Sequence, residues 1–206
     1  MLTLYGMTDS GNCYKPRLLM AKLSRPFRHV ETNSVDGSTR SPAFLAKNPN
    51  GRVPLLELED GRLLSESNAI LVYLGEGTRF VPAEAYARAQ MFQWLFFEQY
   101  SHEPYVAVRI AITRYPERAG DATPERLAST LKSGNAALGV MEVQLEKTPF
   151  LVGDTITLAD LALYAYTHRA ELCGFDLKAF PAVSAWLDRV KADAGHVPIE
   201  WLPQES

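Results

Sequence analysis

Residues 50–77 read NGRVPLLELEDGRLLSESNAILVYLGEG, and this stretch decides the fold class. Two short apolar runs, 53–58 and 62–64, flank the turn sequence Glu-Asp-Gly at 59–61, which predicts a β-hairpin. A helix is expected over 67–74, because the apolar residues continue after a serine and the run then ends in glycine. A hairpin followed directly by a helix indicates a small α/β domain.

The residues before this stretch alternate between strand and helix patterns. Residues 2–5 predict a short buried strand, and residues 27–32 predict a second strand. A helix is expected between them, over about 13–24, with Pro16 in its first turn, where the missing N–H costs little. A short helix opens at the Ser-Pro pair at 41–42. The strand–helix–strand order predicts parallel pairing, to which the hairpin adds an antiparallel edge.

The pattern after a linker at 78–83 is helical throughout, with apolar residues three and four positions apart. The expected helices cover about 84–115, 123–147, 157–174 and 180–195. Pro104 is expected to kink the first of them, and Thr157 with Asp160 resembles a capping box at the start of the third. The predicted domains are therefore 1–77, with an α/β fold, and 84–206, with an all-helical fold.

Composition excludes several classes of protein. The chain has 206 residues, of which 47% are hydrophobic and 22% charged, and its formal net charge is −3. No basic field large enough for nucleic acid or an anionic membrane is expected. No run approaches the roughly 18 apolar residues of a membrane span, and no signal-peptide pattern opens the chain. Two distant cysteines argue against a disulfide scaffold, so a cytoplasmic protein is predicted.

Four local motifs resemble the cytosolic glutathione S-transferase family, in particular its bacterial serine-type members of theta-like or nu-like character. They are LYGMTDSGNCYKPRL from residue 4, NPNGRVPLLEL from residue 48, SESNAILVYL from residue 65 and TLADLALY from residue 157. Their order and spacing match the family over nearly the whole chain. The resemblance implies a thioredoxin-like N-terminal domain with a mixed four-stranded sheet and an all-α C-terminal helical bundle domain. It also implies glutathione as a co-substrate, with no further cofactor and no metal.

The resemblance assigns residues to each part of glutathione. Val53 and Pro54, joined by a cis bond, would offer a backbone edge to the extended tripeptide, although an ordinary trans proline at a strand edge is the alternative. Ser67 at a helix N-terminus suits the γ-glutamyl carboxylate and Glu66 suits the α-amine; alternatively, both only cap the helix. Arg52 would bind the glycine carboxylate, unless it is a solvated surface arginine. The weaker candidates for that end of the ligand are Arg40 and Asn50.

The residue that activates the thiol is expected in the loop before the first helix. Ser10 stands where a thioredoxin-like fold carries its nucleophilic cysteine, which argues against a dithiol centre and favours a hydroxyl bound to the thiolate. Asn12 is the second catalytic candidate, because some bacterial and fungal relatives pair Thr and Asn here and reduce disulfides. Cys13 is expected to be a half-buried small hydrophobe, and Tyr5 ranks last because it lies one residue out of the expected spacing.

The second substrate, a small hydrophobic electrophile, is expected against the helical half, with Tyr105 and Arg109 lining its pocket. His102 is expected to be a structural or interface histidine. The resemblance implies a homodimer, formed through the stretch that carries Trp94, Phe96, Phe97 and Glu98.

The predicted function is conjugation of glutathione to that electrophile. Two alternatives stay open: a glutathione-dependent disulfide or peroxide reductase that uses Ser10 and Asn12, and a non-catalytic protein that binds glutathione or another ligand. An isomerase of the maleylacetoacetate type is less favoured, because its longer serine run is absent from this loop.

Overall fold

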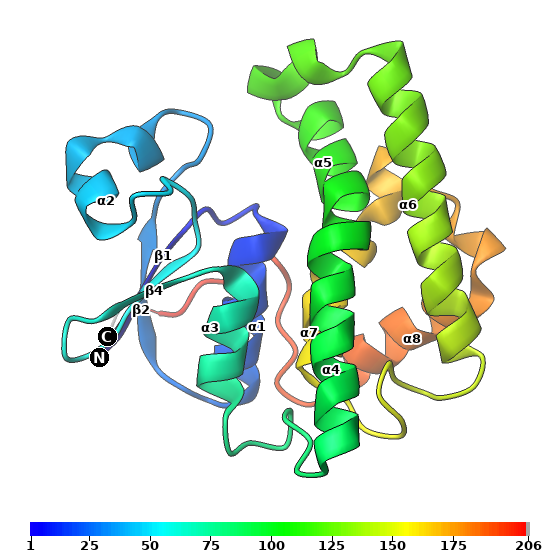
Figure 1. The fold of residues 1–206 in the computed structure, drawn as a ribbon. Coiled ribbons are helices and arrows are strands. Elements are labelled where there is room, and N and C mark those ends of the chain that lie inside the picture. The colour runs from blue at the N-terminus through cyan, green and yellow to red at the C-terminus, as the bar shows by residue number, and fades with distance from the viewer. Residues whose placement is uncertain (205–206) are drawn as a thin grey trace. The chain divides into compact units, whose positions relative to one another are not determined.

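The computed structural model describes residues 1–204 and divides into two compact units (Figure 1). Unit 1 comprises Met1–Glu76 together with the described residues of Ala194–Ser206, and unit 2 comprises Gly77–Asp193. The segment 194–204 therefore packs with the α/β unit, whereas the sequence analysis grouped it with the helices. The domain bounds 1–77 and 84–206 stay a prediction, because grouping by contacts does not show which parts fold alone.

The sheet of unit 1 has four strands in the order β2-β1-β3-β4. The strands are β1 (Leu2–Gly6), β2 (Phe27–Glu31), β3 (Leu55–Glu57) and β4 (Leu63–Ser65). β1 pairs parallel with β2, and β3 pairs antiparallel with both β1 and β4. The mixed four-stranded sheet, with its parallel βαβ half and its hairpin edge, is confirmed.

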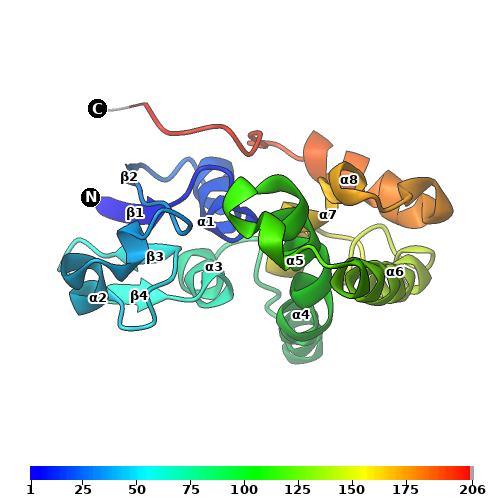
Figure 2. The ribbon, with the colours of Figure 1, turned by 90° about the horizontal axis from the view of Figure 1, so that it is seen from above.

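Three helices accompany this sheet. They are α1 (Gly11–Lys22), α2 (Pro42–Lys47) and α3 (Ser67–Gly75), and a 3-10 turn, Ser38–Arg40, precedes α2. Within unit 1, α1 and α3 lie side by side on one face of the sheet, and α2 lies off the other face (Figures 1 and 2). Fully buried apolar side chains fill the space between the sheet and the α1–α3 pair, among them Leu4, Leu18, Leu56 and Ile70.

Helix α1 starts two residues earlier than predicted. Ser10 is its N-cap, so Pro16 lies in the second turn and not in the first. Proline there donates no backbone hydrogen bond, a cost that the helix tolerates because its apolar side chains, including Leu18 and Leu19, are fully buried.

Unit 2 is helical, as predicted. Its α-helices are α4 (Ala85–Phe97), α5 (Glu103–Arg114), α6 (Pro124–Leu145), α7 (Leu158–Thr167) and α8 (Pro181–Ala192). A π-helical turn, Glu98–His102, separates α4 from α5, and Pro104 begins the new helix beside it. The helix predicted over 84–115 is therefore two helices, and the one predicted over 157–174 ends at Thr167 before a 3-10 turn. No helix among residues 1–204 is long and apolar enough to cross a membrane.

Helix α7 forms the centre of unit 2, since all of its residues are buried. The predicted capping box at its start is present: the Asp160 carboxylate accepts hydrogen bonds from the Thr157 N–H at 2.8 Å and hydroxyl at 3.0 Å. The same carboxylate also accepts from the Leu151 N–H and from the Trp186 indole, each at 2.9 Å. Asp160 thus joins the helix start to a loop and to α8 in the core.

Candidate functional site

Ser10 lies at the start of α1, half-buried, with its hydroxyl at the helix N-terminus. Its backbone is extended, and its Oγ accepts a long hydrogen bond of 3.4 Å from the Cys13 N–H. The Ser10 N–H in turn donates to the Met7 carbonyl at 3.1 Å, which closes the loop between β1 and α1. A hydroxyl in this position can donate to an anion, and that anion benefits from the positive end of the helix dipole.

Asn12 and Ser67 are far apart in sequence but meet in unit 1. The Ser67 hydroxyl donates to Asn12 Oδ1 at 3.2 Å, so the start of α1 and the start of α3 share a hydrogen bond. The sequence analysis assigned these two residues to different parts of glutathione, the thiol and the γ-glutamyl carboxylate. Their contact shows that the polar starts of α1 and α3 lie next to each other.

Lys15 is the site residue that the sequence analysis missed. Its side chain is fully buried, and its ammonium donates to Ser67 Oγ at 3.2 Å and to Asn68 Oδ1 at 3.4 Å. The ammonium of Lys15 therefore lies within hydrogen-bond distance of the Ser67 hydroxyl. A spacing of three between Asn12 and Lys15, which puts both on one face of a helix, is the sequence signal that could have indicated it.

Glu66 has a left-handed backbone conformation, with φ of +69°. A glutamate is rarely found there, and such strain is often kept where it serves a site. The conformation belongs to the N-cap of α3, and the side chain is exposed whereas the next residue, Ser67, is buried. The first amides of α3 and the Glu66 carboxylate therefore lie at one spot, where an anion and a cation of one ligand could bind together.

The Val53–Pro54 peptide bond is cis, which confirms that expectation. Val53 is half-buried and precedes β3, outside the ladder of the sheet. The buried Asn48 organises the turn before it, since its Nδ2 donates to the Arg52 carbonyl at 2.8 Å and its Oδ1 accepts from the Asn50 N–H at 3.2 Å. The backbone at Val53 is thereby presented in a defined conformation beside exposed Arg52.

Arg40 and Asn50 are also neighbours in space. Arg40 Nη1 donates to the Asn50 carbonyl at 3.3 Å, and both side chains are exposed. Gly51 permits this contact: its φ is +61°, and a Cβ there would lie 2.6 Å from Arg40 Nη1. The structure thus brings Arg40 and Asn50 together next to Arg52.

Cys13 and Tyr5, which ranked low as thiol-activating groups, are engaged elsewhere. Cys13 is fully buried, not half-buried, and burial raises the pKa of its thiol to about 11, despite hydrogen bonds that lower it. It is therefore a protonated, inaccessible thiol at neutral pH. The Tyr5 hydroxyl donates to Glu57 Oε2 at 2.7 Å, and that oxygen also accepts from Lys47 at 2.7 Å.

The residues predicted in the helical half have different environments. Tyr105 on α5 is half-buried. Arg109, one turn later, donates from Nε to the Cys173 carbonyl at 2.6 Å and from Nη1 to the Leu127 carbonyl, so it links α5 to α6 and to a 3-10 turn. His102 is fully buried and shares a 3.0 Å hydrogen bond with Thr167 Oγ1, as expected of a structural histidine.

Only some side chains of the stretch predicted to form a dimer are exposed to solvent. Phe96 is 70% exposed, whereas Trp94 and Glu98 are buried. Among the residues that the structure describes, no cluster of His, Cys, Asp and Glu has the arrangement of a metal site.

Comparison with known proteins adds an independent finding. Residues 1–76 match the model of the glutathione S-transferase N-terminal domain, and residues 124–189 match that of the C-terminal domain. The chain is 33% identical to the glutathione S-transferase-like protein LUC7 of a Fusarium species, covering 89% of this chain and 85% of that protein. It is 27% identical to the disulfide-bond oxidoreductase YfcG of Escherichia coli, covering 93% and 91%. A solved structure, a glutathione S-transferase from Pseudomonas fluorescens, is 48% identical, with a TM-score of 0.93 over 96% of this chain and 98% of that one.

Proposed function

The chain belongs to the glutathione S-transferase family, and from this premise we propose that it conjugates glutathione to a small hydrophobic electrophile, with Ser10 stabilising the thiolate. The observation that carries the proposal is the position of the Ser10 hydroxyl at the N-terminus of α1. The start of this helix is hydrogen-bonded to the start of α3 through Asn12 and Ser67. Cys13 next to it is buried, so the loop provides a hydroxyl and no reactive thiol.

The proposed mode of binding uses three parts of unit 1. The γ-glutamyl carboxylate binds the Ser67 hydroxyl and the first amides of α3, and Glu66 binds the α-amine. The cysteinyl backbone of glutathione pairs with the free edge at Val53, before Pro54. The proposed ligands of the glycine carboxylate are Arg52, Arg40 and Asn50.

In the proposed reaction the glutathione thiol loses its proton to water, and the Ser10 hydroxyl donates a hydrogen bond to the thiolate sulfur. The sulfur then forms a bond to the electrophilic carbon, while the electron pair goes to a leaving group or to a conjugated acceptor. The protein contributes a lowered thiol pKa and the orientation of the attack. Tyr105 stays the proposed lining of the second-substrate pocket. Arg109, predicted with it, binds two backbone carbonyls and is proposed to act on that pocket by holding α5 in place.

The second candidate function is reduction of a mixed disulfide, and similarity to YfcG, itself a disulfide-bond oxidoreductase, favours it. The glutathione thiolate at Ser10 and Asn12 would attack the glutathione sulfur of the mixed disulfide, which forms oxidised glutathione and releases the other half as a thiolate that takes up a proton. For a disulfide that contains no glutathione, a second glutathione thiol would complete the exchange. The burial of Cys13 means that the second thiol comes from glutathione and not from this loop.

The assembly is proposed to be a cytoplasmic homodimer. Phe96, at 70% exposure, is the large apolar side chain that a partner would cover in the predicted stretch, and Tyr100, which follows that stretch, is 85% exposed. Sedimentation of the wild type and of Phe96→Glu tests this, and a monomeric wild type would refute it.

The decisive test of the catalytic proposal is the thiolate absorbance of bound glutathione as a function of pH, in the wild type and in Ser10→Ala. We expect a lowered thiol pKa in the wild type that returns towards the free value in the variant. A shift that persists in Ser10→Ala would refute the role of Ser10. Turnover of a glutathione mixed disulfide by the wild type, lost in Asn12→Ala, together with no conjugating activity, would favour the reductase.

A further inference from the structure

Arg17 is a buried arginine that joins the loop of Ser10 to the C-terminal end of the described chain. Its side chain is fully buried on α1, and Nη2 donates to the Thr8 carbonyl at 2.6 Å and to the Ile199 carbonyl at 2.7 Å. Nε and Nη1 are buried without a hydrogen-bond partner among residues 1–204. Burial lowers the pKa of this guanidinium, although nearby groups oppose the shift. A charge buried with so few partners is costly, so the contacts it does make need an explanation beyond stability.

Thr8, which Arg17 contacts, is bound at all three of its polar groups. The Glu31 carboxylate accepts from the Thr8 N–H at 3.1 Å and from its hydroxyl at 2.5 Å, and His29 Nε2 lies 3.0 Å from the same carboxylate. Arg17 binds the remaining group, the Thr8 carbonyl. Because Thr8 stands two residues before Ser10, these contacts set the position of the loop that carries the Ser10 hydroxyl.

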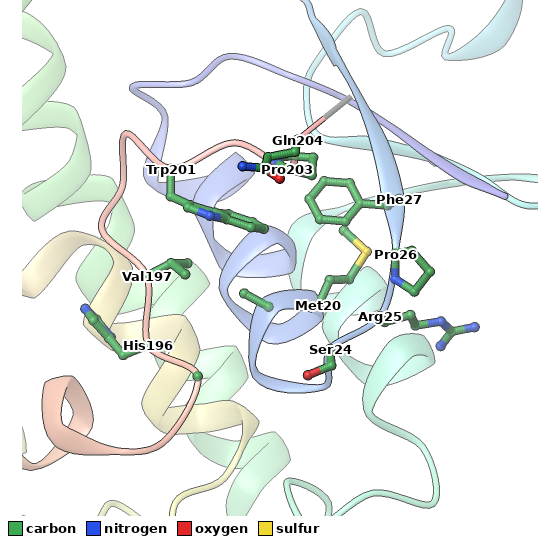
Figure 3. A pocket seen from close by; sticks show the side chains of 12 residues that line it. Met20, Ser24, Arg25, Pro26, Phe27, His196, Val197, Trp201, Pro203 and Gln204 are labelled. Carbon is green, nitrogen blue, oxygen red and sulfur yellow. The ribbon is translucent and has the colours of Figure 1, made fainter. Parts of the chain in front are cut away.

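The other partner of Arg17 belongs to residues 194–204, here named the C-terminal strap. The strap runs along α1: the Tyr14 hydroxyl donates to the Val197 carbonyl at 2.6 Å, and Lys22 donates to the Ala194 carbonyl at 3.4 Å. Ile199 is buried, and the Trp201 ring lies 6.2 Å from that of Phe27 (Figure 3). Three side chains of α1, spaced along its length, therefore bind carbonyls of the strap.

A pocket of about 480 Å³ lies between the strap and the α1–β2 corner, lined by Met20, Phe27 and Trp201 among others (Figure 3). Apolar packing of the strap is thus interrupted at this pocket, and the hydrogen bonds to α1 add to its attachment. Gly195 at its start is also closely fitted: its φ is +76°, and a Cβ there would lie 2.8 Å from the Lys22 Cα.

We propose that the C-terminal strap is a positioning element of the active site, and that Arg17 is the positioning residue through which it acts. The Ile199 carbonyl accepts a hydrogen bond that fixes the Arg17 guanidinium, and the same guanidinium donates to the Thr8 carbonyl. Thr8 in turn positions the loop that carries Ser10. The inference rests on the proposed function in taking Ser10 as the group that binds the thiol, but the coupling from strap to loop is a property of the fold.

The test uses full-length variants in which the strap is disturbed far from the glutathione-binding residues. Ile199→Ala removes buried apolar surface, and Gly195→Ala forces the start of the strap away from α1; neither changes a charge. Arg17→Gln removes the link itself, and Arg62→Gln, at an exposed arginine of the same unit, is the matched control. Hydrogen exchange of the amides of residues 7–13 is measured without ligand. The pKa of the bound glutathione thiol is measured by pH titration, and kcat and KM are measured by steady-state kinetics.

We expect faster exchange in the loop and a thiol pKa that moves back towards the free value in all three variants. A misplaced catalytic group lowers kcat by about 10- to 100-fold, whereas KM for glutathione changes little, because its carboxylate sites are untouched. The double variant Arg17→Gln/Ile199→Ala should lose no more than the worse single variant, since both act through one link. If Arg17→Gln does not fold, the two strap variants still carry the test.

Folded strap variants with wild-type loop exchange and wild-type thiol pKa would overturn the inference, even if conjugation itself is confirmed. Additive losses in the double variant would equally exclude a path through Arg17. The opposite outcome is also possible to recognise: the wild type neither conjugates glutathione nor lowers its thiol pKa, but the variants exchange faster in the loop. This result would support the coupling and refute the proposed function.

Discussion

Replacing Lys15 by methionine removes one positive charge from beside Ser67 while keeping an unbranched side chain. The Lys15 nitrogen lies 3.2 Å from Ser67 Oγ. A carboxylate hydrogen-bonded to that hydroxyl would therefore lie about 6 Å from the charge. With an effective dielectric constant of about 20, the attraction between the two charges is about 3 kcal/mol, which corresponds to about 100-fold in affinity for glutathione.

Titration calorimetry of glutathione with the wild type and Lys15→Met measures this directly. The loss should show little dependence on salt, because the lysine is fully buried. Lys132→Met, which removes an exposed lysine on a helix of unit 2, is the matched control and should bind normally. Urea unfolding checks that the variant is folded under the conditions of the titration. Folded Lys15→Met that binds glutathione within threefold of the wild type would refute the electrostatic role.

Three further predictions concern stability and pH. Asp160→Ala leaves four buried donors without their acceptor and should lower the free energy of unfolding by about 3 kcal/mol or more in urea titrations; a loss below about 1 kcal/mol would contradict this. Gly134→Ala places a Cβ 2.4 Å from the Phe175 ring and should cost about 1–3 kcal/mol, whereas Gly139→Ala in the same helix meets open space and should gain up to about 1 kcal/mol. Burial raises the pKa of Glu31, but hydrogen bonds from Thr8 and His29 outweigh it and hold the pKa below its ordinary value of 4.5. The loop contact is therefore fully present above pH 4.5 and is lost as the pH falls through the lower native pKa. The protection of the loop amides, which compares their exchange rate with the intrinsic rate at the same pH, should fall in that range. An equal fall in Glu31→Gln would exclude Glu31 as the cause.

Much of unit 1 could be predicted because its signals are local. The Asp-Gly turn specifies a hairpin whatever surrounds it, and glycine ends the helix that follows. The same holds for the Thr157–Asp160 capping box, whose two residues lie within one turn. The start of α1 was misjudged by two residues, because the cap by Ser10 competed with the expectation that Pro16 occupies the first turn.

The candidate site was predicted in part, through residues whose chemistry matches a part of glutathione. Ser10, Ser67, Glu66 and Arg52 were named from the family resemblance, and their side-chain chemistry suits the parts of glutathione to which it assigns them. The contact of Ser67 with Asn12 and the binding of Arg109 to two carbonyls could not be read from spacing, since each joins elements far apart in the chain.

The sequence by itself determined the order of strands and helices, the turn and cap positions, and the residue types available to bind glutathione. Only the tertiary structure decided which polar residues of α1 are buried and against what. The helix pattern does not distinguish Lys15 and Arg17 from solvated charges, and Cys13 was expected to be a half-buried small hydrophobe, whereas all three are fully buried. Lys15 contacts α3 and Arg17 contacts the C-terminal strap, at sequence separations of 52 and 182 residues. A buried charge acts through its distance to a partner in three dimensions, and local patterning carries no information about that distance.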